Sequence, residues 1–230
     1  MKYRVVLVEP KYEGNVGSVA RVMKNFGFTD LILINPPKLG DFSLAMAAHA
    51  ADILDNCKIV CSFEEAVNNS DLIVGATGIG GKSNDEHVRM PFSNPAELKE
   101  KFCEIVGVIS LVFGREDVGL SNEELKKCDI IVKIPTSDEY PVMNLSHAAA
   151  VILYELGDVP GGKIQLAKHD NLERLYVHWG SILERVGYPG HKRAKTLLML
   201  RRIFGRSILT GREVQTLRGI LRKIEWRINK

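Results

Sequence analysis

Short apolar runs that alternate with helical patterns constrain the fold of this chain most. The apolar runs are Val5–Val8, Leu31–Ile34, Ile59–Val60, Leu72–Val74, Ile105–Phe113 and Ile130–Ile134. The stretches with helical spacing between and after them are 15–26, 43–50, 63–69, 94–102, 121–127 and 144–156. Continuously apolar strands that alternate with helices are typical of parallel sheets buried on both faces. We therefore predict an α/β fold with a parallel sheet and helices on both of its faces.

The charge of the chain changes sign near residue 160. Residues 1–162 carry 15 Lys and Arg against 23 Asp and Glu, a net charge of −8. Residues 163–230 carry 16 Lys and Arg against 5 Asp and Glu, a net charge of +11. The change coincides with the Pro- and Gly-rich segment "LGDVPGGK" at 156–163, which is typical of a linker. We predict a first domain over residues 1–160 and a basic helical extension over residues 161–230.

The basic extension has the pattern of three helices, at about 165–187, 192–204 and 211–228. In the last of them the apolar residues form one stripe, and the arginines lie mostly outside it. Solvated cationic helices are common, but so few acidic residues favour a nucleic-acid partner. The cations expected to contact RNA are Arg193, Lys195, Arg201, Arg202, Arg206, Arg212, Arg218 and Arg222.

The chain lacks the features of membrane and secreted proteins. No run of 18 apolar residues occurs, and the N-terminal sequence "MKYRVVLVEP" has no signal-peptide pattern. The four cysteines, Cys57, Cys61, Cys103 and Cys128, are scattered and have no zinc-ligand spacing. We expect free thiols, no metal site, no membrane partner and a cytoplasmic location.

The stretch "GATGIGGKS" at 75–83 is similar to a phosphate-binding P-loop. In a P-loop four residues separate the first glycine from the Gly-Lys-Ser end, which would place that glycine at 76, but residue 76 is Ala and the glycine is at 75. The polar stretch after Lys82 also lacks the helical periodicity that a P-loop requires. A nucleotide phosphotransferase is therefore the weaker alternative, and Gly75–Gly78 stays open as a binding loop.

Three further segments combine glycines with polar side chains. In 9–28, Asn15 follows the first strand, and Arg21 lies in the next helix, where an arginine can bind a phosphate. In 111–125, charged residues follow Gly114 at the end of a strand, where ligands bind in α/β proteins. In 134–156, Asn144 caps an Ala-rich helix. Taken singly, each segment is equally compatible with caps, salt bridges and charged loops.

Together, "GNVGSVARVMKNFG", "LVFGREDVGLSNEEL" and "YPVMNLSHA" resemble the three ordered signature motifs of the SPOUT, or trefoil-knot, RNA methyltransferases. The most similar branch is the TrmJ-like tRNA ribose 2′-O-methyltransferases. The resemblance covers about residues 1–160, and a helical C-terminal extension is usual in that branch. It implies a C-terminal trefoil knot in the sheet domain, which general rules of chain topology would not predict. It also implies a homodimer with its active site near the dimer interface.

The resemblance implies a bound S-adenosylmethionine (SAM), a tRNA partner and methylation of the anticodon-loop ribose at position 32. The residues implied for SAM are Ala76, Thr77, Gly78, Gly114, Ile134, Pro141, Val142 and Met143. Arg21 matches the key catalytic arginine, and Asn15, Glu116 and Asn144 match further positions of the catalytic motifs. Because the pKa of a guanidinium lies above about 12, we expect Arg21 to bind phosphate and stabilise the developing oxyanion.

Val142 departs from the family pattern. Many members have a serine there, and a valine side chain cannot donate or accept a hydrogen bond. The serine's role must therefore be absent from this chain or supplied by another group. An rRNA 2′-O-methyltransferase and a knotted RNA-binding protein without catalysis remain as alternatives.

Overall fold

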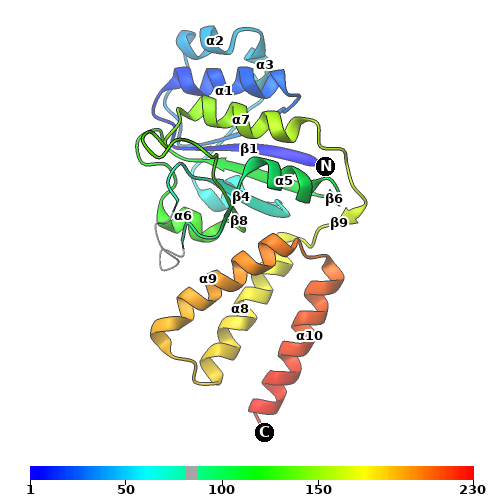
Figure 1. Cartoon of the computed structure of the whole chain (residues 1–230). Coiled ribbons are helices and arrows are strands. Elements are labelled where there is room, and N and C mark those ends of the chain that lie inside the picture. Colours follow the sequence, from blue (N-terminus) through cyan, green and yellow to red (C-terminus); the bar gives the residue numbers. More distant parts are fainter. Residues whose placement is uncertain (81–87) are drawn as a thin grey trace.

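The computed structural model describes residues 1–80 and 88–230, and a seven-stranded sheet lies at the centre of its N-terminal part (Figure 1). The strand order is β3-β2-β1-β7-β4-β8-β5, and neighbouring strands pair in parallel throughout. The strands are β1 (Lys2–Val8), β2 (Asp30–Ile34), β3 (Lys58–Val60), β4 (Leu72–Ala76), β5 (Phe92–Ser93), β7 (Val108–Phe113) and β8 (Ile130–Val132). The predicted parallel sheet is confirmed.

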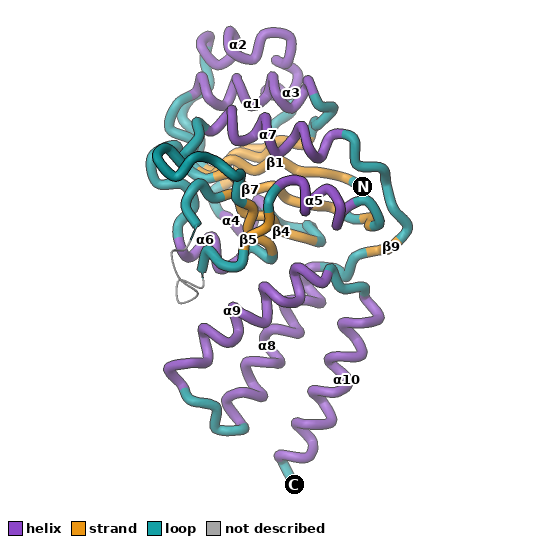
Figure 2. Tube along the Cα trace, in the orientation of Figure 1, coloured by secondary structure: helices purple, strands orange, loops and turns teal. Residues whose placement is uncertain are grey.

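Helices cover both faces of this sheet. Successive strand residues point to opposite faces, so Val5 and Leu7 of β1 join one apolar cluster, and Val6 and Val8 join the other. The first cluster includes residues of α1 (Glu13–Asn25), α3 (Ala51–Asp55), α5 (Pro95–Phe102) and α7 (Leu145–Gly157). The second includes residues of α4 (Phe63–Ala66) and α6 (Asn122–Lys127). In Figure 2 the strands lie between these helical layers, and α2 (Asp41–Ala47) lies outside α1.

Side-chain caps define where several of these helices begin. Ser121 accepts a hydrogen bond from the backbone N–H of Glu124, whose carboxylate accepts one from the Ser121 N–H in return, forming a capping box on α6. Asn144 caps α7 by accepting from the Ser146 N–H at 2.9 Å. These caps satisfy N–H groups that have no partner inside the helix.

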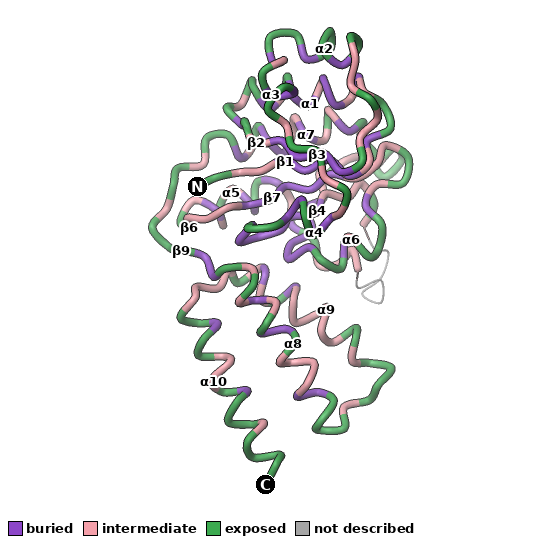
Figure 3. The backbone as a smooth tube through the Cα atoms, turned by 180° about the vertical axis from the view of Figure 1, so that it is seen from behind, coloured by how far each residue is buried: buried purple, intermediate pink, exposed green. Residues whose placement is uncertain are grey.

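A lobe of three helices follows the sheet domain, as Figure 3 shows from behind. It consists of α8 (His169–Arg185), α9 (Gly190–Ser207) and α10 (Gly211–Ile228) around a small apolar core. This confirms the predicted helical extension. The expected helix start at 165 is wrong, because Ile164–Gln165 forms β9, which pairs in parallel with β6 (Ile105–Val106).

Arg202 of α9 attaches the helical lobe to the sheet domain. Its side chain is 1% exposed and donates to the carbonyls of Leu125 (2.7 Å), Val88 (3.0 Å) and Cys128. The carbonyls of Leu125 and Cys128 lie at the C-terminal end of α6, where the last carbonyls have no N–H partner four residues ahead in the helix. The prediction that Arg202 contacts RNA is therefore corrected, because its guanidinium is buried and hydrogen-bonded to backbone carbonyls of the sheet domain.

Arg201 is also engaged at this junction. It pairs with the buried carboxylate of Asp129 at 3.3 Å and with Glu173 of α8 at 2.6 Å. Close backbone approach supports the contact, since a Cβ on Gly205 would lie 2.4 Å from the Asp129 carbonyl oxygen. The prediction that Arg201 binds RNA is corrected for the same reason, because two carboxylates neutralise its charge.

The apolar run 105–113 does not form one strand. The single apolar run 105–113 is divided at Gly107 into β6 and β7, which belong to different sheets. The loops 114–121 and 133–144, which follow β7 and β8, lie at the same end of the sheet.

The trefoil knot that the resemblance implies stays a prediction. Among the described residues, no helix has both the length and the apolar character needed to span a membrane.

Candidate active site

A pocket opens at the carboxyl ends of three neighbouring strands. Ala76, Phe113 and Val132, the last residues of β4, β7 and β8, all line it. Ligand sites of open parallel sheets form at this end, where the strands deliver their loops. The structure brings together all eight residues that the family resemblance implies for the cofactor: Ala76, Thr77, Gly78, Gly114, Ile134, Pro141, Val142 and Met143.

The loop after β7 forms one wall through an unusually close backbone contact. Arg115 and Gly119 exchange backbone hydrogen bonds of 3.3 and 2.9 Å. A Cβ on Gly114 would lie 2.1 Å from the carbonyl carbon of Gly119, so only glycine fits there. Gly119 itself has φ +67°, a conformation that glycine adopts without strain.

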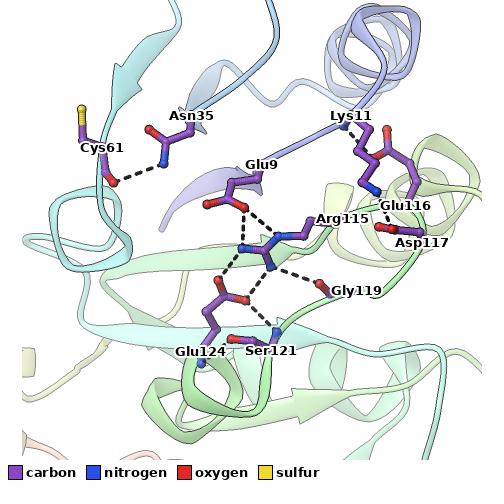
Figure 4. Close-up of polar contacts among 10 residues, drawn as sticks. All are labelled: Glu9, Lys11, Asn35, Cys61, Arg115, Glu116, Asp117, Gly119, Ser121 and Glu124. Carbon is purple, nitrogen blue, oxygen red and sulfur yellow. Dashed lines mark hydrogen bonds and ion pairs between the residues drawn. The ribbon is translucent and has the colours of Figure 1, made fainter.

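Arg115 holds this loop in place (Figure 4). Its Nε donates to Glu9 at 2.8 Å, and its two terminal nitrogens donate to Glu124 at 3.1 and 3.0 Å. The bond to Glu124, with that to Glu9, raises the pKa of Arg115 despite partial burial. Burial raises the pKa of Glu124, but the bonds from Arg115 and Ser121 outweigh it and leave that pKa below its ordinary value. Arg115 is therefore a structural member of the pocket wall.

The residues predicted from the catalytic motifs, apart from Arg21, form one hydrogen-bonded chain beside the pocket. Asn15 donates through Nδ2 to Glu116 at 2.8 Å, and its Oδ1 accepts from Asn144 Nδ2 at 3.2 Å. Glu116 also accepts from the backbone N–H of Lys11 at 2.8 Å. Segments more than 100 residues apart in sequence thus meet at one point, and Glu116, which lines the pocket, is fixed on the side of α1.

Arg21 lies on α1 but apart from this chain. Six residues separate it from Asn15, which corresponds to about 9 Å along the helix axis and about 120° around it. Arg21 is exposed, and no described residue forms a hydrogen bond or ion pair with its side chain. Its guanidinium is therefore available to a ligand from outside the chain.

The remaining walls are loops without regular secondary structure. Thr77 Oγ1 accepts from the Ile79 N–H at 3.3 Å and donates to the Ile79 carbonyl at 2.9 Å, while Thr136 donates to the Pro141 carbonyl at 2.9 Å. A Cβ on Gly78 would lie 3.4 Å from Val142, so the two loops face each other closely. The predicted P-loop end, Gly81-Lys82-Ser83, lies outside the described residues.

Sequence reasoning missed Arg89, which also lines the pocket. It lies between the described residue Val88 and strand β5, in a stretch without periodicity or motif. Its Nη1 donates to Asn122 Oδ1 on α6 at 3.1 Å. No sequence signal could have identified it, because only the fold brings this stretch to the ends of β4 and β7.

The pocket fits SAM by its chemistry. Its lining includes buried apolar side chains, among them Phe113, Leu120 and Ile152, together with residues of three loops and a few charged side chains. Apolar walls with a small number of placed polar groups are typical of cofactor sites. Among the described residues, no three His, Cys, Asp or Glu side chains are grouped to hold a metal ion.

The other cations assigned to RNA lie on the helical lobe. Arg212 and Arg222 on α10 are exposed, and Arg193 pairs with Glu184 at 3.1 Å. Arg206 donates to the Arg202 carbonyl at 3.1 Å. Lys195 is exposed and Arg218 is half-buried. RNA contact by these six residues stays a prediction.

Comparisons with protein families give two matches that together cover most of the chain. Residues 2–154 match the model described as "SpoU rRNA Methylase family". Residues 170–230 match the model described as "tRNA methyltransferase TrmJ, C-terminal domain". The gap between the two matches contains the predicted linker, and the boundary at residue 160 stays a prediction.

Individual proteins match over nearly their whole length. The chain is 40% identical to tRNA (cytidine-2′-O-)-methyltransferase TrmJ of Methanocaldococcus jannaschii, over 93% of this chain and 95% of that protein. It is 35% identical to tRNA (cytidine/uridine-2′-O-)-methyltransferase TrmJ of Pectobacterium atrosepticum, over 96% of each. The crystal structure of TrmJ from Z. mobilis ZM4 superposes with a TM-score of 0.76 at 25% identity, covering 98% of this chain and 100% of that one.

Proposed function

Since the chain belongs to the SpoU rRNA methylase family, we propose that it transfers a methyl group from SAM to a ribose 2′-oxygen of tRNA. The observation that carries this proposal is the convergence at one pocket. All eight residues expected to contact SAM line it, and the hydrogen-bonded chain from Asn15 through Glu116 to Asn144 lies next to it. The two relatives named above as tRNA 2′-O-methyltransferases match this chain over almost their full length.

In this proposal the protein contributes mainly position and charge. SAM, when bound, supplies a methyl group on a sulfonium, which is already activated for transfer. Asn15, Glu116 and Asn144 hold the loop after β7 against α1 and α7, so that the pocket wall does not need to reorganise during the reaction. Glu116 is constrained by its bond to the Lys11 N–H.

Arg21 would bind the RNA phosphate next to the target ribose. A guanidinium with a pKa above about 12 cannot accept the 2′-hydroxyl proton at neutral pH, but it can stabilise the oxyanion that develops as the proton leaves. Its exposure and its lack of a protein partner among the described residues support this role.

The substrate follows from the relatives and from the helical lobe. We place the target at position 32 of the anticodon loop. We propose cytidine and uridine as the accepted nucleotides, because the names of the relatives give these two. Exposed cations on α10 would hold the tRNA body through its phosphates. The proposal places the enzyme in the cytoplasm together with its substrate.

We also propose that the protein is a homodimer. The face formed by α1, α2 and α7 exposes large apolar side chains: Tyr12, Phe42, Leu44, Met46 and Tyr154. Apolar patches of this kind mark interaction surfaces, and Arg21 lies on the same helix α1. Sedimentation should give a dimer for the wild type and a monomer for Leu44→Glu, whereas a monomeric wild type would contradict the assignment.

The direct test is transfer of labelled methyl from SAM to total tRNA, with wild type beside Arg21→Ala. The product is digested with nuclease and identified by mass spectrometry. We expect a 2′-O-methyl nucleoside that disappears in the variant, while the variant still binds SAM in calorimetry. A methylated base, or transfer to rRNA in place of tRNA, would contradict the proposal. SAM binding without any transfer would indicate the RNA-binding alternative, in which Val142 replaces a needed serine.

A further inference from the structure

Arg89 is a cation in the lining of the SAM pocket, and its guanidinium is only partly hydrogen-bonded by the described residues. Its Nη1 donates to Asn122 Oδ1 at 3.1 Å, and its Nε is buried without a hydrogen-bond partner in the described part of the chain. No carboxylate among the described residues forms an ion pair with it. A buried donor without a partner is costly, so this guanidinium has capacity for an anionic ligand.

The other charged side chains around the pocket are already engaged. Arg115 is saturated by Glu9, Glu124 and the Gly119 carbonyl. Asp117 pairs with Lys11, and Glu116 belongs to the chain with Asn15 described above. Within the described residues, Arg89 is thus the cation of the pocket lining that remains available.

The position of Arg89 is fixed from two sides. Asn122, the first residue of α6, holds one end of its guanidinium. The preceding backbone is held by Arg202, whose Nη2 donates to the Val88 carbonyl at 3.0 Å. Because Arg202 is buried at the junction with the helical lobe, the lobe itself contributes to placing Arg89. Such preorganisation distinguishes a binding group from a mobile surface arginine.

We propose that Arg89 binds the α-carboxylate of SAM. This carboxylate is the anionic group of the cofactor at neutral pH, and a guanidinium recognises a carboxylate through paired N–H donors. The adenosine part would lie against the apolar side chains of the lining, so that the amino-acid end extends toward the charged ones. The inference rests on the proposed function, because it requires that SAM be the ligand of this pocket.

The test is calorimetric binding of three ligands to wild type, Arg89→Met and Arg89→Lys. SAM and S-adenosylhomocysteine carry the carboxylate, whereas 5′-methylthioadenosine lacks the whole amino-acid end. In Arg89→Met we expect the Kd of the first two to rise about 10-fold to 100-fold, as for removal of a charge-assisted hydrogen bond. The Kd of 5′-methylthioadenosine should stay within about twofold. Arg89→Lys retains the charge but not the planar guanidinium, so its Kd for SAM should lie between those of wild type and Arg89→Met.

A matched control removes a positive charge from α6 without touching the pocket. Lys126 is exposed and pairs with Glu123, and Lys126→Met should leave the affinity for all three ligands unchanged. Equal losses for all three ligands in Arg89→Met would overturn the inference and show that Arg89 only shapes the pocket. Unchanged SAM affinity with weakened tRNA affinity would also overturn it and assign the guanidinium to an RNA phosphate. If wild type binds none of the three, the proposed function itself fails.

Discussion

At the scale of single residues, Arg201 and Arg202 of α9 show that the position of an arginine decides whether its charge is available to RNA or used inside the protein. Arg202 is buried against the end of α6, although its sequence context of basic residues is typical of an RNA-binding helix. The sequence predicts helix α9 and its positive charge, but it does not predict which face of the helix packs against the sheet domain. Eight of the pocket residues, in contrast, are implied by the resemblance of three ordered motifs to a known family. The residues alone indicate only that glycine and polar motifs follow the strand ends.

Replacing Arg202 with Met should destabilise the protein. The change leaves the carbonyls of Cys128 and Val88 without this donor, while the Leu125 carbonyl keeps its bond from the Cys128 N–H. An unsatisfied buried group costs about 1–3 kcal/mol. We expect the free energy of unfolding in urea to fall by at least about 2 kcal/mol. Arg212→Met, an exposed control on α10, should change it by less than about 0.5 kcal/mol. A stable Arg202→Met protein in which only tRNA affinity falls would restore the sequence-based prediction.

At the scale of elements, the apolar runs predicted the strands of three or more residues and missed the two-residue strands β5 and β9. Runs in β1, β2, β4 and β7 are buried on both sides, so their composition alone identifies them. Strand β5 has two residues and β9 has two, and strands this short carry no periodicity. Strand order could not be predicted either, because the placement of β7 between β1 and β4 depends on contacts far apart in sequence.

Gly114→Ala should disrupt the pocket wall. The added Cβ would collide with the backbone of Gly119 and Leu120, at 2.1 and 2.2 Å, so the loop must move. We expect a loss of stability of about 1–3 kcal/mol, as for overpacking, together with weaker SAM binding in calorimetry. Gly211→Ala is a suitable control, since nothing lies within 4 Å of its Cβ position. Unchanged SAM affinity in Gly114→Ala would show that the loop does not form the cofactor site.

At the scale of the whole molecule, charge separates the two parts of the chain. The sheet domain is acidic and the helical lobe is basic, and the corrections at Arg201 and Arg202 remove two cations from the surface available to RNA. The exposed arginines of α10, Arg212 and Arg222, remain as candidate phosphate contacts. The lobe would then attract tRNA while its α9 face stays attached to β8 and α6.

The salt dependence of tRNA binding tests this division. Each RNA phosphate that the protein no longer neutralises should reduce the slope of log K against log salt by about 0.7 to 0.9. The double variant Arg212→Gln with Arg222→Gln should therefore bind more weakly at low salt and show a shallower slope. Lys58→Gln with Lys126→Gln removes the same charge from the sheet domain and should leave the slope unchanged. An equal effect of both pairs would mean that overall charge, rather than α10, attracts the RNA.

The central claim is that the enzyme methylates a ribose 2′-oxygen of tRNA at position 32. The most direct measurement uses a tRNA transcript with one 2′-deoxy nucleotide at that position, beside the all-ribose transcript, with labelled SAM. The account predicts methyl transfer to the all-ribose transcript and none to the deoxy transcript, because the attacking oxygen is missing. Equal transfer to both transcripts would contradict it, since the methyl group would then be placed on a base or on another nucleotide.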